Sequence, residues 1–396
     1  MHGALAGLRV IDLSRVLAGP LCTQILSDHG ADVIKIEPPT GDETRTLGPP
    51  FNDDGDAAYF TAVNRGKRGI ALNLAQPEGR DTLLSLLRDA DVLVENFIPG
   101  TMQRWGLDFD DELKPRFPGL IYCSISGFGA EGPLGGLPGY DAVLQAMCGL
   151  MSVNGDPASG PTRMGIPIVD HLTGYTALTG ILLALYHRNR TGLGQRVEAT
   201  LFDTALSLLV PHAANWMHSN QVPGLLGSAH PNIAPYDKFQ CEDGLVFLGI
   251  LNDRQFAKFC AVVDLQGLVG DPRFTTNAAR LLHRDELRRQ IETVLAGWKR
   301  ETVCGALMRS GVPVGPVHTV PEALSQAHAV YRGMSLSIDG YKGIGVPVRL
   351  SRTPGRPGRP PPRFGQHTHE VLEEAGLDQR RISYLTATDV CPDAAR

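Results

Sequence analysis

Asp170 is the residue whose type and position point most directly to chemistry. It follows a run of Gly, Pro and β-branched residues, 165–169, and precedes a long apolar stretch. This pattern predicts a short strand, then the carboxylate, then a buried helix. With an ordinary pKa of about 3.9, an aspartate is ionised at pH 7 and can attack an activated acyl group. Aspartate is also a favoured helix N-cap, and from the residues alone that structural role stays open.

Several other chemistries are excluded because their motifs are missing. The loop Ser14–Pro20 lies between a predicted strand and helix but has no G-x-G-x-x-G, so we expect no nicotinamide or flavin. A P-loop and a G-x-S-x-G motif are also missing, which argues against a P-loop NTPase and an ordinary serine hydrolase. Two histidine pairs lack a third ligand at suitable spacing, so we expect no metal site. They are His212 with His218, and His367 with His369.

Composition narrows the class further. The chain has 396 residues, a formal net charge of -5 and seven scattered cysteines without a C-x-x-C. The length predicts two or three domains, and the acidic balance argues against nucleic acid as a partner. The cysteine pattern is typical of reduced thiols, so we expect a cytoplasmic protein. The first seven residues show no basic region followed by an apolar one, so we expect no signal peptide. The longest uncharged apolar stretch, Leu172–Tyr186, falls short of a bilayer span, so we expect a buried helix and no membrane partner.

The first part of the chain alternates short strands with amphipathic helices. Strands are predicted at Leu8–Leu13, Asp32–Ile36, Gly69–Leu74, Asp91–Glu95 and Leu120–Ile125, and helices at Leu21–His29 and Pro77–Asp89. This alternation predicts an α/β fold with a mostly parallel sheet. Ligands of such sheets bind at the carboxyl ends of the strands. Those ends are Ser14–Gly19, Asn73, Asn96–Gly100 and Ser126–Gly129.

A second, smaller α/β domain is predicted at about 225–325. Composition shifts near Pro223, Gly244–Ile250 has the pattern of a hairpin strand, and Arg280–Trp298 that of a charged amphipathic helix. The Pro-, Gly- and Arg-rich segment Arg352–Pro362 predicts an extended connection without regular structure.

Six segments, in order along the chain, together resemble the class III (CaiB/BaiF) CoA-transferases. They are Gly7–Pro20, Ala31–Pro39, Asn64–Arg68, Val94–Phe97, Gly139–Asp141 and Val169–Asp170 with its helix, and the late segment Gln366–Leu372 also fits. The similarity spans almost the whole chain. No single motif is as diagnostic as a P-loop, but six in the correct order make chance similarity very improbable.

The resemblance implies a fold that spacing alone could not give. It implies a large Rossmann-like domain built from 1–224 and the returning tail 326–396, with the small domain 225–325 inserted between them. It also implies an interlocked homodimer, in which each chain threads through a ring formed by the other.

The resemblance also implies roles for individual residues. The family's nucleophile falls on Asp170. Arg104 is suited to a phosphate of CoA, because a guanidinium can bond phosphate oxygens in pairs. The CoA-contacting positions fall on Val16, Leu17, Leu72, Asn73, Asn96, Phe97, Arg104 and Tyr140.

The sequence departs from the family pattern at three places. Leu17 stands where some relatives have Gln. Pro38 stands where some relatives have Arg, and the loss of that Arg removes one contact to CoA. The glycine run that closes over the active site in formyl-CoA transferases is missing at 249–253, so we do not expect formyl or oxalyl substrates. The cations that could replace the missing Arg are Arg45, Lys67 and Arg68.

The implied reaction is CoA transfer from an acyl-CoA, with succinyl-CoA as the expected donor, to a free carboxylic acid. Asp170 would form an aspartyl anhydride and then an aspartyl-CoA thioester. Acyl-CoA and the acid are the expected small-molecule partners, with CoA as a substrate. Arg15 and Arg45 are candidates to pair with the distal carboxylate of succinate.

Two alternatives stay open. A 2-methylacyl-CoA racemase needs an acid and a base on opposite faces of the α-carbon. Racemases carry Gly-His-Asp where this chain has Gly-Tyr-Asp, and Tyr140, with an ordinary pKa of about 10, is a poor base. The other alternative is a CoA-binding protein that has lost its activity, against which the presence of Asp170 argues.

Overall fold

The computed structural model describes residues 3–393, which form two compact units. Of the described residues, the larger unit combines 3–148, 165–208 and 327–393, and the smaller combines Gly149–Met164 and Leu209–Gln326. The small domain predicted at 225–325 therefore differs from the observed unit, which begins earlier and takes in a separate segment. A backbone hydrogen bond of 2.9 Å from Gly227 to Gly155 ties that segment to the smaller unit, a long-range contact that composition does not reveal.

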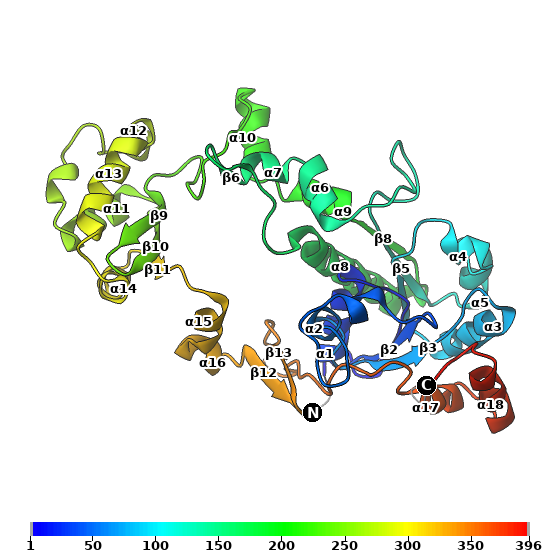
Figure 1. Cartoon of the computed structure of the whole chain (residues 1–396). Helices are drawn as coiled ribbons and strands as arrows, with labels where there is room; N and C mark the ends of the chain where they lie inside the picture. The colour runs from blue at the N-terminus through cyan, green and yellow to red at the C-terminus, as the bar shows by residue number, and fades with distance from the viewer. Residues whose placement is uncertain (1–2, 394–396) are drawn as a thin grey trace. The chain divides into compact units, whose positions relative to one another are not determined.

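A six-stranded parallel sheet forms the core of the larger unit (Figure 1). Its strands are β1 (Arg9–Asp12), β2 (Asp32–Glu37), β3 (Arg68–Ala71), β4 (Val92–Glu95), β5 (Ile121–Ser126) and β8 (Arg196–Thr200). The order is β3-β2-β1-β4-β5-β8, so the chain moves outward on one side of β1 and then returns to the other. The carboxyl ends of β1 and β4 thus flank the switch point, where sheets of this type bind ligands. The predicted α/β class and parallel sheet are confirmed.

Helices α1 (Ala18–Asp28) and α8 (Ile168–Thr191) pack against each other beside this sheet. The buried residues of α8 recur every three or four positions, so one face enters the core. They are Val169, Thr173, Gly174, Ala177, Ile181, Ala184 and Leu185. The prediction of a buried helix thus holds for one face, while apolar residues of the other face are exposed. Within residues 3–393, α8 is the one helix that is long and apolar enough to cross a membrane, a test that core helices also pass.

The remaining elements of the larger unit are short. They are η1 (Glu43–Thr46), α2 (Ala58–Ala62), α3 (Pro77–Leu86), η2 (Leu87–Asp89), α4 (Thr101–Arg104), η3 (Phe109–Leu113), α5 (Lys114–Arg116), α6 (Asp141–Met147), α9 (Leu201–Ser207), α16 (Ala327–Tyr331), β12 (Ser335–Ile338), β13 (Tyr341–Ile344), α17 (Thr368–Glu374) and α18 (Gln379–Ala387). Segment 352–362 has no regular structure, as predicted. After it, α17 packs against β3, so the C-terminal segment covers the edge of the sheet that β3 forms (Figure 1).

The smaller unit is built on an antiparallel sheet in the order β11-β10-β9. Its elements are α7 (Leu150–Val153), β6 (Gly155–Asp156), β7 (Gly160–Pro161), α10 (His212–Ser219), β9 (Tyr236–Cys241), β10 (Gly244–Gly249), α11 (Asp253–Val262), η4 (Gln266–Leu268), α12 (Asn277–Leu282), α13 (Arg284–Leu295), α14 (Arg300–Arg309), β11 (Val314–Pro316) and α15 (Val320–Ser325). The single helix predicted at Arg280–Trp298 is broken at His283. In the segment 249–253, Asn252 caps α11 by accepting a hydrogen bond of 2.9 Å from the Gln255 N–H.

Candidate active site

Six of the nine predicted site residues line one cavity at the switch point between β1 and β4. The cavity takes residues from the loop after β1, the loop after β4, the segment before α6 and the first turn of α8. The six are Val16, Leu17, Asn96, Phe97, Tyr140 and Asp170. Residues far apart in sequence therefore meet where the topology places a ligand site.

The other three predicted residues lie elsewhere. Leu72 and Asn73 line a second cavity, which shares Arg15, Phe97 and Ile98 with the first. Arg104 lines neither cavity; its exposed side chain donates a hydrogen bond of 2.8 Å to Thr101 Oγ1. The structure thus gives Arg104 a local contact on α4, and its contact to CoA stays a prediction.

Asp170 is the third residue of α8, not the end of a strand. The helix begins at Ile168 after Pro167, and no side chain of its own segment caps it. Instead Asp141 Oδ1 accepts hydrogen bonds from the N–H groups of Val169 (2.7 Å) and Asp170 (3.2 Å). The strand prediction was wrong, and the capping role considered for Asp170 belongs to Asp141. The Asp170 side chain is therefore left to face the cavity.

The surroundings of Asp170 favour its neutral form. Burial, followed by the nearby charge of Asp141, raises the pKa of Asp170 to about 7. The expectation of an ordinary aspartate pKa was therefore wrong, because it ignored desolvation. At neutral pH this carboxyl group is poised between a nucleophilic carboxylate and its protonated form. Such a perturbed group in a cavity is typical of an active site.

Sequence reasoning did not single out two further titratable side chains, Tyr59 beside Asp170 and Glu95 at the end of β4. Tyr59, in the short helix α2, lies close enough that Asp170 and Asp141 add to burial in raising the pKa of its phenol, which stays neutral. Glu95 ends β4 and accepts hydrogen bonds from Phe97 N–H (2.8 Å) and Tyr122 OH (3.0 Å). Burial raises the pKa of Glu95 to about 7. Glu95 and Asp141 each lay in a segment that carried the resemblance, Val94–Phe97 and Gly139–Asp141, whereas Tyr59 had no sequence signal.

The loop after β1 is held in a strained conformation. Val16 has φ of 69°, in the left-handed region that β-branched residues rarely adopt. Lys35 Nζ donates to Ser14 O and Lys67 Nζ donates to Pro20 O, each at 2.9 Å, so both ends of the loop are fixed. The loop can therefore present Val16 and Leu17 to the cavity in one arrangement.

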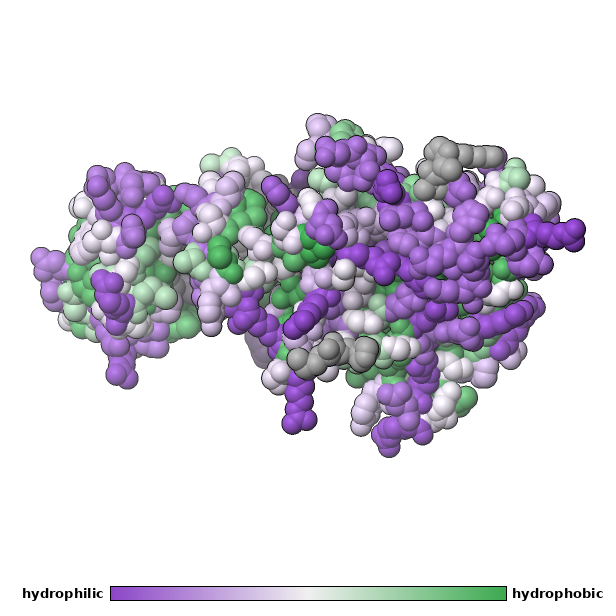
Figure 2. All heavy atoms as spheres, turned by 90° about the horizontal axis from the view of Figure 1, so that it is seen from below, coloured by the Kyte–Doolittle hydropathy of each residue, from purple (hydrophilic) through white to green (hydrophobic). Residues whose placement is uncertain are grey.

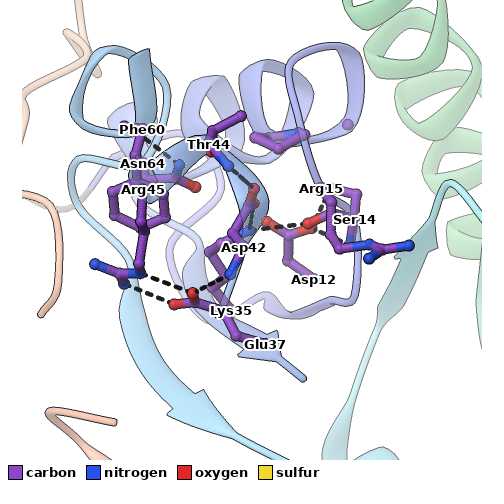
Figure 3. Close-up of polar contacts among 12 residues, drawn as sticks. Asp12, Ser14, Arg15, Lys35, Glu37, Asp42, Thr44, Arg45, Phe60 and Asn64 are labelled. Atoms are coloured by element: carbon purple, nitrogen blue, oxygen red, sulfur yellow. Dashed lines mark hydrogen bonds and ion pairs between the residues drawn. The ribbon is translucent and has the colours of Figure 1, made fainter. Parts of the chain in front are cut away.

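The two lysines belong to a buried network of charges, of which Figure 3 labels Lys35, Asp42 and Asp12. Lys35 pairs with Asp42 and Lys67 with Asp12, each at 2.9 Å, and all four side chains are fully buried. Burial opposes the charge of Asp12, but Lys67 and Lys35 hold the pKa of its carboxyl group below the usual range. Breaking one such pair would leave an uncompensated buried charge, which costs about 3–5 kcal/mol.

None of the three cations suggested as replacements for an Arg at position 38 is free to bind CoA. Arg45 is buried and bonds both Glu37 oxygens (2.7 and 2.8 Å) and Asp56 (2.8 Å). Lys67 is committed to Asp12. Arg68 pairs with acidic residues of β2 and α17, which are Asp32, Glu370 and Glu374. Among the residues that line the two cavities, the remaining cation is Arg15.

No three His, Cys, Asp or Glu side chains gather at metal-binding spacing within residues 3–393. All seven cysteines are buried and free.

Comparison with known proteins gives consistent similarities across the chain. Residues 5–368 match the sequence model of CoA-transferase family III. The succinate–glutarate CoA-transferase of Agrobacterium fabrum (strain C58) is 39% identical over 387 residues, covering 95% of this chain and 96% of that protein. The succinyl-CoA:glutarate CoA-transferase of Mus musculus is 38% identical and covers 98% of this chain and 90% of its own. A crystal structure of a CaiB/BaiF family protein from Brucella suis matches with a TM-score of 0.86 and 40% identity, covering 95% of this chain and 100% of that one.

Proposed function

The chain belongs to CoA-transferase family III and is therefore a CoA-transferring enzyme, and we propose that it moves CoA from succinyl-CoA to a free carboxylic acid through Asp170. The resemblance seen in the sequence is thereby confirmed at the level of the family. The observation that carries the proposal is the position of the Asp170 carboxyl group. It lines a cavity at the switch point of the sheet, and Asp141 rather than Asp170 caps α8.

In the proposed mechanism, each step at Asp170 exchanges one activated acyl group for another, so the free energy of the thioester is kept. The Asp170 carboxylate attacks the thioester carbonyl, the C–S bond breaks, and an aspartyl mixed anhydride and CoA thiolate form. The thiolate attacks the Asp170 carbonyl, which releases the free acid and leaves an aspartyl-CoA thioester. The incoming carboxylate attacks this thioester to form a new anhydride, and CoA thiolate then takes the acyl group and frees Asp170.

The anhydride must be protected from water, which would hydrolyse it. The apolar side chains of Val16, Leu17 and Phe97 line the cavity around Asp170. They support the proposal because they limit the water next to the reacting carbonyl.

The choice of donor rests on the relatives. Both curated relatives described above are named for succinate or succinyl-CoA together with glutarate, and both of these acids are dicarboxylic. We therefore propose a succinyl-CoA donor and a dicarboxylic acceptor for this chain as well.

The test is a mass-spectrometric exchange assay. Purified protein is incubated with succinyl-CoA or acetyl-CoA and a panel of free acids, and new acyl-CoA masses are recorded. We expect exchange in the wild type and none in Asp170→Asn, which keeps the shape of the side chain. Asp203→Asn is the matched control, because Asp203 is an exposed residue at the same position of helix α9. Exchange that persists in Asp170→Asn would overturn the nucleophile assignment.

If the wild type binds CoA but shows no exchange, the two alternatives, a 2-methylacyl-CoA racemase and an inactive CoA-binding protein, are favoured. Loss of deuterium from an α-deuterated acyl-CoA without any acceptor acid would then indicate the racemase. If neither reaction occurs, the protein is a CoA-binding protein without activity.

We also propose that the chain works as a cytoplasmic homodimer. The free cysteines support a reducing compartment. The outer face of α8 exposes four large apolar side chains, a pattern typical of a protein–protein interface. They are Tyr175, Leu182, Leu183 and Tyr186.

A further inference from the structure

Arg15 is the one cation among the described residues that line the two cavities, and its side chain is loosely held. Its Nη1 lies 3.3 Å from Glu43 Oε2, and its guanidinium carbon lies 5.5 Å from the centre of the Phe97 ring. The side chain is 36% exposed. A single long ion pair between two half-exposed groups contributes little stability. Arg15 can therefore exchange Glu43 for another carboxylate at low energetic cost.

The backbone of Arg15, by contrast, is fixed. Its N–H donates to Asn96 Oδ1 at 2.8 Å, and Asn96 Nδ2 donates to its carbonyl oxygen at 2.6 Å. The side chain of Arg15 can move, but the point from which it extends into the cavity cannot.

One buried ammonium group sets the spacing between Arg15 and Glu43. Lys35 Nζ donates to Ser14 O and to Asp42 Oδ2, each at 2.9 Å. Ser14 and Asp42 directly precede Arg15 and Glu43 in the chain. Figure 3 shows the Arg15 side chain directed away from this buried network. The network therefore holds the two backbones in place and leaves the guanidinium available.

We propose that Arg15 binds the distal carboxylate of a dicarboxylic acyl group or acid whose other carboxyl group reacts at Asp170, and that Glu43 is the partner it releases. This inference rests on the proposed function. A planar guanidinium bonds a carboxylate through two parallel N–H groups, so a substrate carboxylate can replace the single Glu43 contact. Arg15, Glu43 and Asp170 all line the same cavity. Arg15 is thus a specificity-determining residue for substrates with a second carboxylate.

The test compares two acceptors of equal chain length, glutarate and pentanoate. In the proposed reaction, kcat/KM for an acceptor does not depend on the donor, so the ratio of the two values reports the distal carboxylate alone. Arg15→Gln should lower the glutarate-to-pentanoate ratio by about 10- to 100-fold, the usual effect of losing a charged hydrogen bond. Arg15→Lys, which keeps the charge but not the paired geometry, should fall between wild type and Arg15→Gln.

Two further variants complete the series. Glu43→Gln should keep or raise the ratio, because it removes the competing carboxylate. Arg289→Gln, an exposed residue of α13 in the smaller unit, is the matched charge control and should leave the ratio unchanged. A ratio that is unchanged in Arg15→Gln, or that falls in Glu43→Gln, would overturn the proposal.

Calorimetric binding of glutarate and of free CoA separates this proposal from the proposed function. Glutarate binding should weaken in Arg15→Gln while CoA binding is kept. If CoA binding weakens and glutarate binding does not, Arg15 contacts CoA phosphate and the assignment is wrong. A third outcome is that the wild type binds glutarate but transfers CoA to neither acid, and that Arg15→Gln binds glutarate more weakly. In that case Arg15 does bind the carboxylate, and the proposed function is wrong.

Discussion

Asp170 owes its chemical character to two features at the residue scale, its partial burial and its neighbour Asp141. Together they raise the pKa of Asp170 to about 7. Since only the ionised form is a nucleophile, the reaction should depend on pH within the neutral range.

We expect kcat/KM for succinyl-CoA to be constant above about pH 7 and to fall about tenfold per pH unit below it. The measurement is a pH profile of the initial rate between pH 5.5 and 9. Asp141→Asn keeps an oxygen acceptor for the start of α8 but removes the charge, so its acid limb should shift to lower pH. A flat wild-type profile over this range would show that Asp170 does not control the step.

The same pKa shift predicts an effect on stability. A carboxyl group whose pKa is raised on folding binds its proton more tightly in the folded state, so folding loses stability as pH rises from about 4 to 7. Asp170→Asn removes this loss and should raise the melting temperature by roughly 2 °C or more at pH 8. Most of the gain should be lost near pH 4, where the folded state is protonated and the unfolded aspartate, with a pKa of about 3.9, is about half protonated.

Calorimetric melting at pH 8 and pH 4 measures this difference. Asp203→Asn, at the same position of α9, should not show the gain. A lower melting temperature for Asp170→Asn at pH 8 would mean that the charge is stabilised by contacts other than those described.

At the element scale, the contact between α1 and α8 depends on Gly174. A Cβ atom at this position would lie 2.7 Å from the carbonyl oxygen of Ala18, a backbone atom that cannot move away alone. Gly174→Ala should therefore lower the free energy of unfolding by about 1–3 kcal/mol, although alanine normally favours a helix. Because Ala18 also lines the cavity, KM for succinyl-CoA should rise.

Urea denaturation and steady-state kinetics test this prediction. Thr176→Ala is the control, since Thr176 is exposed on α8 two residues away and its replacement should change stability by about 0.5 kcal/mol at most. If Gly174→Ala is as stable as the wild type, α1 and α8 are able to separate without penalty.

Most strands of the sheet were predictable because they are short runs rich in apolar residues between turn signals, and these local patterns agree with the sheet. The start of α8 was not predictable, because Ile168 and Val169 after a proline favour a strand locally, whereas the cap comes from Asp141. The ion-pair partners of the basic residues were not predictable either, because Arg68 pairs with Glu374, which lies about 300 residues later in the sequence. Local pattern therefore located the candidate site, while long-range contacts decided which charges remain available in it.

At the scale of the whole molecule, the exposed apolar face of α8 predicts self-association. Figure 2 shows that the larger unit, viewed from the side of α17 and α18, is mostly hydrophilic, as a solvated face should be. The outer side chains of α8 differ, and Leu183 is 65% exposed. We expect light scattering to give about twice the 42.7 kDa of one chain.

Leu183→Glu should reduce that mass to a single chain, because it buries a charge in the proposed interface. Leu282→Glu is the control, since Leu282 is an exposed leucine of the smaller unit and its change should leave the mass unchanged. A monomeric wild type, or a dimer that survives Leu183→Glu, would contradict this interface.

The outer strand β3 has a consequence for synthesis of the protein on the ribosome. Its neighbour Asn73 donates to Val390 O at 2.7 Å, and Arg68 finds two of its acidic partners on α17. At about 5–20 residues per second, roughly 15–60 s pass between the emergence of this edge and that of the segment that covers it. During this interval the nascent chain carries an open strand and an incompletely paired arginine. Translation speed and chaperone supply should therefore decide how much of the newly made chain reaches the native state.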